Sequence, residues 1–336
     1  MKLFHSIFGG REETSGHYPE SLIEAAIERA VDGTDARLRL LPGYRKHLRA
    51  PVIHAIDHVI PLVNNLPAPV PAGPKEFAAD PRLGALYAGP ADLLDHFSRD
   101  HSLAAYLSTP EGQGADRVTA LVLARRSERT ILGIDLSGET LRRDVPQVTV
   151  SFGDQNVVDP RDSEAEARRQ LKRRAFDHLL TLALARIGEV RVERADLMRQ
   201  RDLLRSKLAA FKRGGWSFTP PEGKQQDPAA LAKDLDGITD QLAALGRDDQ
   251  VLQAHLELVA DLLQDAEHQL WAEDLTLYID PMNIERDPQD PAARKIVLQE
   301  LHNAQGRRLT MLLVSFAPRD LPVREDLVTA AGRYLY

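Results

Sequence analysis

Two long stretches with heptad spacing constrain the fold of this chain more than any other feature. In 173–211 the apolar residues return at alternating steps of three and four positions, and 231–270 repeats the pattern at similar length. Such spacing places an apolar stripe along one side of a helix and is typical of coiled coils. The sequence therefore predicts two long helices that each need a partner for their stripe.

The two stripes match in register when the chain folds back on itself between them. Phe211 then faces Leu231, and every following layer of the stripes stays paired. In this register Arg194 lies opposite Asp249, which is the one acid in the second stripe. A buried charge is tolerated when it is paired, and such a pair sets register more than it adds stability. We therefore predict an antiparallel coiled-coil hairpin over 163–272 with a buried Arg194–Asp249 ion pair. Its first helix should begin at Ser163, which can act as the N-cap with Glu166 three residues later.

The segment that joins the two helices, 212–228, is longer than a turn requires and contains several glycines and prolines. Long loops tend to be functional, and tryptophan is enriched among the residues that contribute most to protein interfaces. We expect this tip to contact a protein partner through Lys212, Arg213, Trp216 and Phe218. The alternative is that both aromatic rings fold back and cover the last layer of the hairpin.

The chain on either side of the hairpin predicts an α+β fold. Residues 18–110 contain several short amphipathic helical patterns, whereas 117–160 and 273–320 contain runs of β-branched and aliphatic residues. The two ends of a hairpin lie side by side, so we expect the strands before and after it to form one mixed or antiparallel sheet. The prediction is a helical N-terminal unit followed by a β domain that is interrupted by the hairpin.

Finer details of these flanking regions leave some alternatives open. The proline-rich stretch 67–74 predicts a stiff loop. The runs 118–124, 130–136 and 145–152 predict a three-stranded meander whose strands are divided by polar turns. The stretch 291–316 forms either a β-hairpin, which the Asn-Ala-Gln-Gly turn favours, or a helix followed by a strand. We expect 1–17 to be flexible and 321–336 to form a short helix and tail.

Composition excludes several classes of protein. The chain has 336 residues, of which 43% are hydrophobic, so it can form two or three units with their own cores. Its net charge of -7 argues against a nucleic-acid-binding protein. The absence of cysteine excludes disulfides and thiolate chemistry and fits a reducing compartment. We expect a cytoplasmic protein without transmembrane segments, with peripheral membrane contact through Leu3, Phe4, Ile7 and Phe8 as an open alternative.

Motifs for catalysis or cofactor binding are missing from the sequence. It contains no phosphate-binding loop, dinucleotide fingerprint, zinc-protease, calcium-loop or nucleophile-elbow pattern, and we predict no cofactor. One set of residues has the types and the spacing of metal ligands, because two histidines four positions apart on a helix can share one ion. This alternative metal site comprises His54, Asp57, His58, Asp95 and His96.

The sequence therefore supports two hypotheses of different classes. The first is a non-enzymatic scaffold or adaptor that uses the coiled-coil arm or its tip to hold a protein partner. The second is a metal-dependent hydrolase with its site in the helical N-terminal unit. A third reading, in which the arm serves only to dimerise with another copy, is opposed by the polar residues that flank both stripes.

Overall fold

A computed structural model of the chain describes residues 18–137, 140–212, 228–245 and 250–322. The contacts divide these residues into two compact units. The first unit consists of the described parts of Met1–Asp57 and Phe176–Ala266, and the second of those of His58–Ala175 and Glu267–Tyr336.

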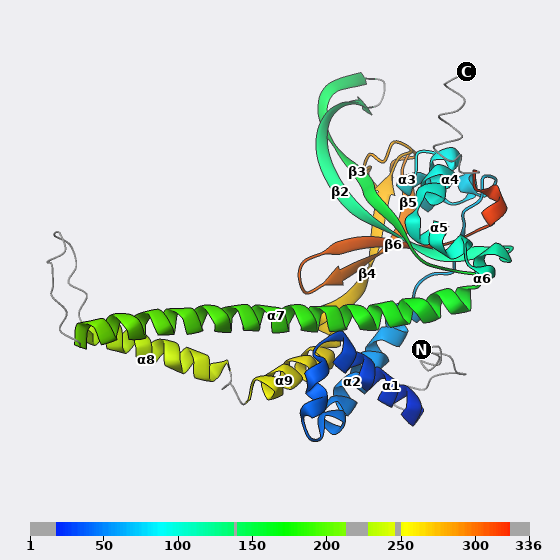
Figure 1. Ribbon diagram of the computed structural model, residues 1–336. Helices are drawn as coiled ribbons and strands as arrows, with labels where there is room; N and C mark the ends of the chain where they lie inside the picture. The colour runs from blue at the N-terminus through cyan, green and yellow to red at the C-terminus, as the bar shows by residue number, and fades with distance from the viewer. Residues whose placement is uncertain (1–17, 138–139, 213–227, 246–249, 323–336) are drawn as a thin grey trace, which may run out of the picture. The chain divides into compact units, whose positions relative to one another are not determined.

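Helices and strands occur in runs along the chain, and Figure 1 labels most of them. The helices are α1 (Glu20–Gly33), η2 (Ala36–Leu40), α2 (Tyr44–Asn64), η3 (Phe77–Ala79), α3 (Pro81–Leu86), α4 (Pro90–Arg99), α5 (His101–Leu107), α6 (Pro110–Gln113), α7 (Glu164–Lys212), α8 (Pro228–Ala244), α9 (Val251–Gln264), α10 (Ala266–Gln269) and η4 (Pro318–Asp320). The strands are β1 (Val70–Pro71), β2 (Val118–Ser137), β3 (Thr140–Arg161), β4 (Leu270–Ile279), β5 (Arg294–Asn303) and β6 (Arg308–Phe316).

The predicted α+β class is confirmed by this set of helices and by a largely antiparallel sheet. The helical N-terminal region is divided differently from our expectation, because the contacts assign 18–57 and 58–110 to different units. Helix α2 continues from one unit into the other, and so does α7.

The sheet of the second unit has the strand order β3-β2-β6-β5-β4, and β1 pairs in parallel with the end of β6. The strands on both sides of the long helices thus join in one sheet, as predicted. The sequence leaves two topologies open for 291–316. The structure has the β-hairpin, because β5 pairs antiparallel with β6. Gly306 supplies the positive φ of +76° that their connecting turn requires.

The expected three-stranded meander is wrong, because 118–124 and 130–136 form the single long strand β2. The polar residues Arg125–Arg129 do not form the expected turn, because they continue the strand and pair with Gly153–Thr149 of β3. Beyond Ala124, β2 pairs with β3 alone among the described residues. Most of its described side chains there are exposed to water, so the polar sequence resembles that of a loop.

The proline-rich stretch 67–74, which was expected to be a loop, contributes the two-residue strand β1. Its two residues pair with Val314 and Ser315 of β6. The rest of the stretch forms no helix or strand, as the prolines predict.

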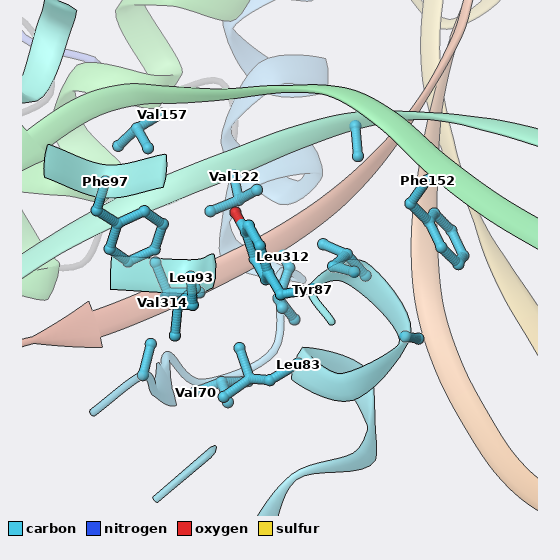
Figure 2. Packing of buried hydrophobic residues seen from close by; sticks show 14 of the residues in the cluster. Val70, Leu83, Tyr87, Leu93, Phe97, Val122, Phe152, Val157, Leu312 and Val314 are labelled. Carbon is cyan, nitrogen blue, oxygen red and sulfur yellow. The ribbon is translucent and has the colours of Figure 1, made fainter. Parts of the chain in front are cut away.

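Two cores cover the two faces of the sheet, because neighbouring residues of a strand point to opposite sides. Figure 2 shows the larger core, in which Leu83, Leu93 and Phe97 of α3 and α4 pack on Val122 and Leu312. The smaller core lies on the other face. It contains Val63, Leu66, Leu121, Leu171, Met311 and Leu313.

The start of α7 is fixed by three polar contacts in the second unit. The predicted N-cap is confirmed, since the Glu166 amide donates to Ser163 Oγ at 3.4 Å. Arg168 donates to the carbonyl oxygens of Val63 in the last turn of α2 and of Leu66 just beyond it. Arg174 donates two hydrogen bonds to the buried Asp159, which lies at a bulge of β3 with φ of 51°.

The first unit is a bundle of helices built around one side of α7. Its core contains the apolar faces of α1 and α9, the first part of α2 and the segment of α7 from Phe176 to Ile187. Helices α1 and α7 approach closely, because a Cβ added to Gly33 would lie 3.0 Å from Leu180 Cδ1. Arg29 of α1 and Asp177 of α7 form a bidentate ion pair across the same contact, at 2.6 and 2.7 Å.

Candidate protein-interaction site

Helix α7 continues far beyond the residues that anchor it in the first unit. Ile187 is its last fully buried residue among those whose exposure is described. At about 1.5 Å per residue, the remaining part, Gly188–Lys212, spans about 37 Å. We call this part of α7, together with α8, the helical arm. Figure 1 shows α8 alongside the end of α7.

The predicted apolar stripes are the less exposed sides of both helices of the arm. On α7 the stripe positions Leu197, Leu204 and Leu208 are half-buried, and on α8 Leu231 and Leu242 are fully buried. This pattern agrees with helices that pack on each other along the stripes. The supercoiled geometry of a coiled coil stays a prediction.

The expected ion pair of Arg194 cannot be described, because Asp249 lies outside the described residues. Arg194 Nη1 donates to the carbonyl oxygen of Leu242 at 3.4 Å. Helix α8 ends at Ala244, so this carbonyl is one of the last four, which lack partners within the helix. Arg194 therefore lies at the C-terminal end of α8, where a positive charge is favourable.

The second helix of the predicted hairpin is not continuous, which corrects the expectation of one helix over 231–270. Helix α8 ends at Ala244, and α9 begins at Val251. The sequence contains Gly246 between them, a residue with poor helix propensity, although 246–249 lie outside the described residues. At the other end, Leu270 belongs to β4, where it pairs with Asn303. Leu270 is therefore in a strand, although the spacing of the apolar residues predicted a helix at this position.

The predicted tip lies almost wholly outside the described residues. Lys212 is the last residue of α7, whereas Arg213, Trp216 and Phe218 fall in the undescribed segment. Their contact with a partner stays a prediction.

A buried polar cluster at the base of the arm was missed by the sequence analysis. Asp35, which is 7% exposed, caps η2 and accepts hydrogen bonds from Arg37. The same carboxylate is 2.5 Å from Arg191 Nη2 of α7 and 3.0 Å from His255 Nδ1 of α9. We call these four residues the Asp35 cluster. It joins three elements that are far apart in the sequence.

The charges in the Asp35 cluster follow from its hydrogen bonds and burial. The Arg37 guanidinium holds the pKa of the Asp35 carboxyl well below its usual range, so Asp35 is ionised. His255 is 1% exposed, and burial lowers its pKa despite the neighbouring carboxylate. His255 is therefore neutral at pH 7 and donates its Nδ1 hydrogen to Asp35. A clue was present in the sequence, since His255 lies four positions before Val259 on the apolar side of its helix.

The five residues of the alternative metal site do not come together but make separate contacts in the two units. His54 and Asp57 belong to the first unit, and Asp57 accepts a 2.6 Å hydrogen bond from the Tyr18 hydroxyl. The other three, His58, Asp95 and His96, belong to the second unit.

Each of these three has a local role in the second unit. His58 Nε2 lies 2.6 Å from the carbonyl oxygen of Leu270, and Asp95 pairs with Arg99 at 3.0 Å. Burial lowers the pKa of His96, whose ring lies 5.6 Å from that of Tyr87. Across the described ranges, no group of three or more histidine and carboxylate side chains is arranged to hold a metal ion. The structure thus gives the metal-dependent alternative no support.

A second polar cluster lies at one end of the sheet, on the same face as the larger core. Glu300 is buried and accepts a 2.7 Å hydrogen bond from Arg126 Nε. His302, two residues further along β5, stacks on Trp271 with ring centres 5.5 Å apart. The Nε2 atom of His302 lies 3.7 Å from Glu300. These contacts join β2, β4 and β5 and explain the polar end of an otherwise apolar face.

The exposed side of α7 carries apolar side chains with no cover in the described part of the chain. Leu184 is 43% exposed, Val192 63% and Leu203 56%. Beside Val192 the surface forms a hollow of about 640 Å³. The hollow is lined by Gly188, Glu189, Val192, Glu193, Asp196, Leu197 and Gln200.

Comparisons with known proteins provide no family for this chain. No family model, no curated protein and no solved structure matches it. The described helices include none that is both long and apolar enough to cross a membrane. Any statement about function therefore depends on the residues themselves.

Proposed function

We propose that this protein is a non-enzymatic scaffold or adaptor that holds a protein partner on its helical arm. The observation that supports this most is the length of α7 beyond its buried part. Gly188–Lys212 contributes no fully buried side chain among those described, yet it exposes Val192 and Leu203. A helix that projects in this way without adding to a core needs another reason for its length. A rod sets two binding surfaces at a fixed distance, which catalysis by itself does not require.

The base of the arm supports the same proposal. The Asp35 cluster connects η2, α7 and α9 at the level of Arg191, just beyond the last buried residue of α7. A fixed base keeps the orientation of a rod, and a partner held on it then has a defined position. We further propose a cytoplasmic location, which the absence of cysteine supports.

The test shortens the arm without disturbing its pairing. Deleting 202–208 together with 235–241 removes one heptad from each helix and leaves the remaining stripe positions facing the same partners. The arm becomes about 10 Å shorter. Tagged wild-type and shortened chains are used to capture proteins from native lysate, and the captured proteins are compared by mass spectrometry.

We expect at least one protein that is captured by the wild type and lost from the shortened chain. Trp216→Ala combined with Phe218→Ala tests the predicted tip in the same way. Leu40→Ser serves as the control, because Leu40 is exposed on η2 and is not part of the arm. Identical sets of captured proteins from all variants would contradict the proposal.

A further inference from the structure

One side of α7 combines exposed apolar residues with carboxylates. Leu184, Gly188 and Val192 follow one another at intervals of four residues, and Leu203 lies three turns beyond Val192. At about 100° per residue these positions fall on one side of the helix, away from the stripe that contains Ile187 and Leu204. The exposed apolar residues are therefore not a continuation of the stripe that packs on α8. They form a second surface.

The carboxylates lie directly beside this apolar surface. Glu189, Glu193 and Asp196 line the hollow next to Val192, and all three are exposed. The surface is open at Gly188, because a Cβ added there would meet no atom within 4 Å. We call Leu184, Gly188, Val192 and Leu203 with these three acids the α7 docking face.

We propose that the α7 docking face binds an amphipathic helix of a partner protein, whose apolar residues contact Val192 and enter the hollow and whose lysine or arginine side chains pair with the carboxylates that line it. The inference rests on the proposed adaptor function and names the chemistry of its partner. An amphipathic helix with apolar residues at intervals of three and four matches the spacing of the apolar positions on α7. Basic flanks match the three carboxylates.

Existing ion pairs on the face do not prevent this binding. Arg186 pairs with Glu189 at 2.8 Å, and Arg199 pairs with Asp196 at 2.7 Å. All four side chains are exposed, and such surface pairs contribute little. Glu189 and Asp196 can therefore leave these arginines and form ion pairs with a partner. Glu193 has no ion pair within the part of the chain that the structure describes.

A second copy of this chain fits the face less well than a basic helix. In an antiparallel pair of α7 helices centred on Val192, the acidic side of one copy would face the acidic side of the other. Glu193 would then lie near its own counterpart, and Glu189 near Asp196. Like charges at this distance destabilise a helix pair. The same carboxylates would repel anionic lipid head groups.

The test uses the purified full chain and a synthetic helical peptide labelled with a fluorophore. The peptide carries leucine at intervals of four residues and lysine or arginine on both flanks. A second peptide keeps the basic residues but has serine in place of leucine. Binding is followed by fluorescence anisotropy, and circular dichroism confirms that each variant of the chain is folded.

We expect saturable binding of the leucine peptide that is weakened at least tenfold by Val192→Asp and, separately, by Glu193→Lys. Val192 and Glu193 are exposed, so neither change disturbs a core. Asp240→Lys changes an exposed acid of α8 by the same charge and should leave binding unchanged. Binding of the serine peptide should be at least tenfold weaker than that of the leucine peptide.

Several results would overturn the inference. These are absence of binding, equal binding of both peptides, or equal loss from Asp240→Lys and Glu193→Lys. Sedimentation of the free chain provides a further check, because a dimer abolished by Val192→Asp would show that the face binds a second copy. If the shortened arm loses its captured proteins while the peptide result is negative, the adaptor function stands and only this inference fails.

Discussion

Replacing Asp35 tests whether the buried cluster holds the base of the arm. The carboxylate contacts Arg37, Arg191 and His255, at distances from 2.5 to 3.2 Å. Asp35→Ala removes all these contacts and the N-cap of η2. The cap contributes about 1 kcal/mol. The hydrogen bond to buried His255 contributes about 1.5 kcal/mol, because His255 is left without a partner for its Nδ1 hydrogen.

The two arginines add less to this sum. Both are about half exposed, so water replaces much of the lost interaction. Arg191 contributes about 0.5 kcal/mol, and the more exposed Arg37 is not counted. We therefore expect Asp35→Ala to lower the free energy of unfolding by about 3 kcal/mol. Asp35→Asn retains one oxygen, which can keep the cap at the Oδ1 position but places an amide nitrogen beside His255 and Arg191, so its cost should be about 2 kcal/mol.

The assay is urea unfolding followed by circular dichroism, with the slope of the transition checked for constancy. Asp32→Ala is the matched control, because Asp32 is an exposed acid of the same helical region that pairs with Arg39. Its effect should stay below about 0.5 kcal/mol. If Asp35→Ala and Asp32→Ala have the same small effect, the cluster does not stabilise the first unit and our reasoning about its burial is wrong.

Three further predictions concern helix packing, pH and the register of the arm. Gly33→Ala should lower the free energy of unfolding by about 1–2 kcal/mol in urea, because the new Cβ would crowd Leu180 at 3.0 Å. Burial lowers the pKa of His255 in the folded chain, so the unfolded chain binds a proton more readily. The free energy of unfolding should therefore fall as pH drops below about 6.5. His255→Gln should reduce this dependence on pH. Leu204→Cys with Ile238→Cys should form a disulfide in the arm, seen as a mobility shift on non-reducing gels.

Each of these predictions has its own control. Gly84 lies in α3 with no atom within 4 Å of an added Cβ, so Gly84→Ala should not destabilise. An unchanged pH slope in His255→Gln would show that the histidine is not buried in its neutral form. Because the chain has no native cysteine, Leu204→Cys with Leu242→Cys is a clean register control. If this second pair crosslinks equally well, the predicted register is wrong.

The local patterns of the sequence predicted much of the fold, because they depend on neighbouring residues. Ser163 and Glu166 marked the start of α7, and the heptad spacing marked the side of the arm that is less exposed. The turn before Gly306 favoured the β5–β6 hairpin. In each case the signal lies within a few residues or follows a simple period.

Features that depend on distant partners were missed or misassigned. Arg125–Arg129 has the composition of a turn, and only its pairing with β3 makes it a strand. Asp35 and His255 are 220 positions apart, and neither has a local motif that predicts the other. The exposed side of α7 was also overlooked. Leu184, Val192 and Leu203 are eight and eleven positions apart, with residues of the packed stripe between them, so their alignment becomes apparent only with the exposure of each side chain.

The most direct test of the proposed function is site-specific photo-crosslinking in living cells. A photoreactive phenylalanine analogue is placed at Val192 in the full chain, and in a separate chain at Val297, which is exposed on β5. Our account predicts a discrete crosslinked protein from Val192 and none of the same mass from Val297. The absence of any protein crosslink at Val192, or the same product from both positions, would contradict it.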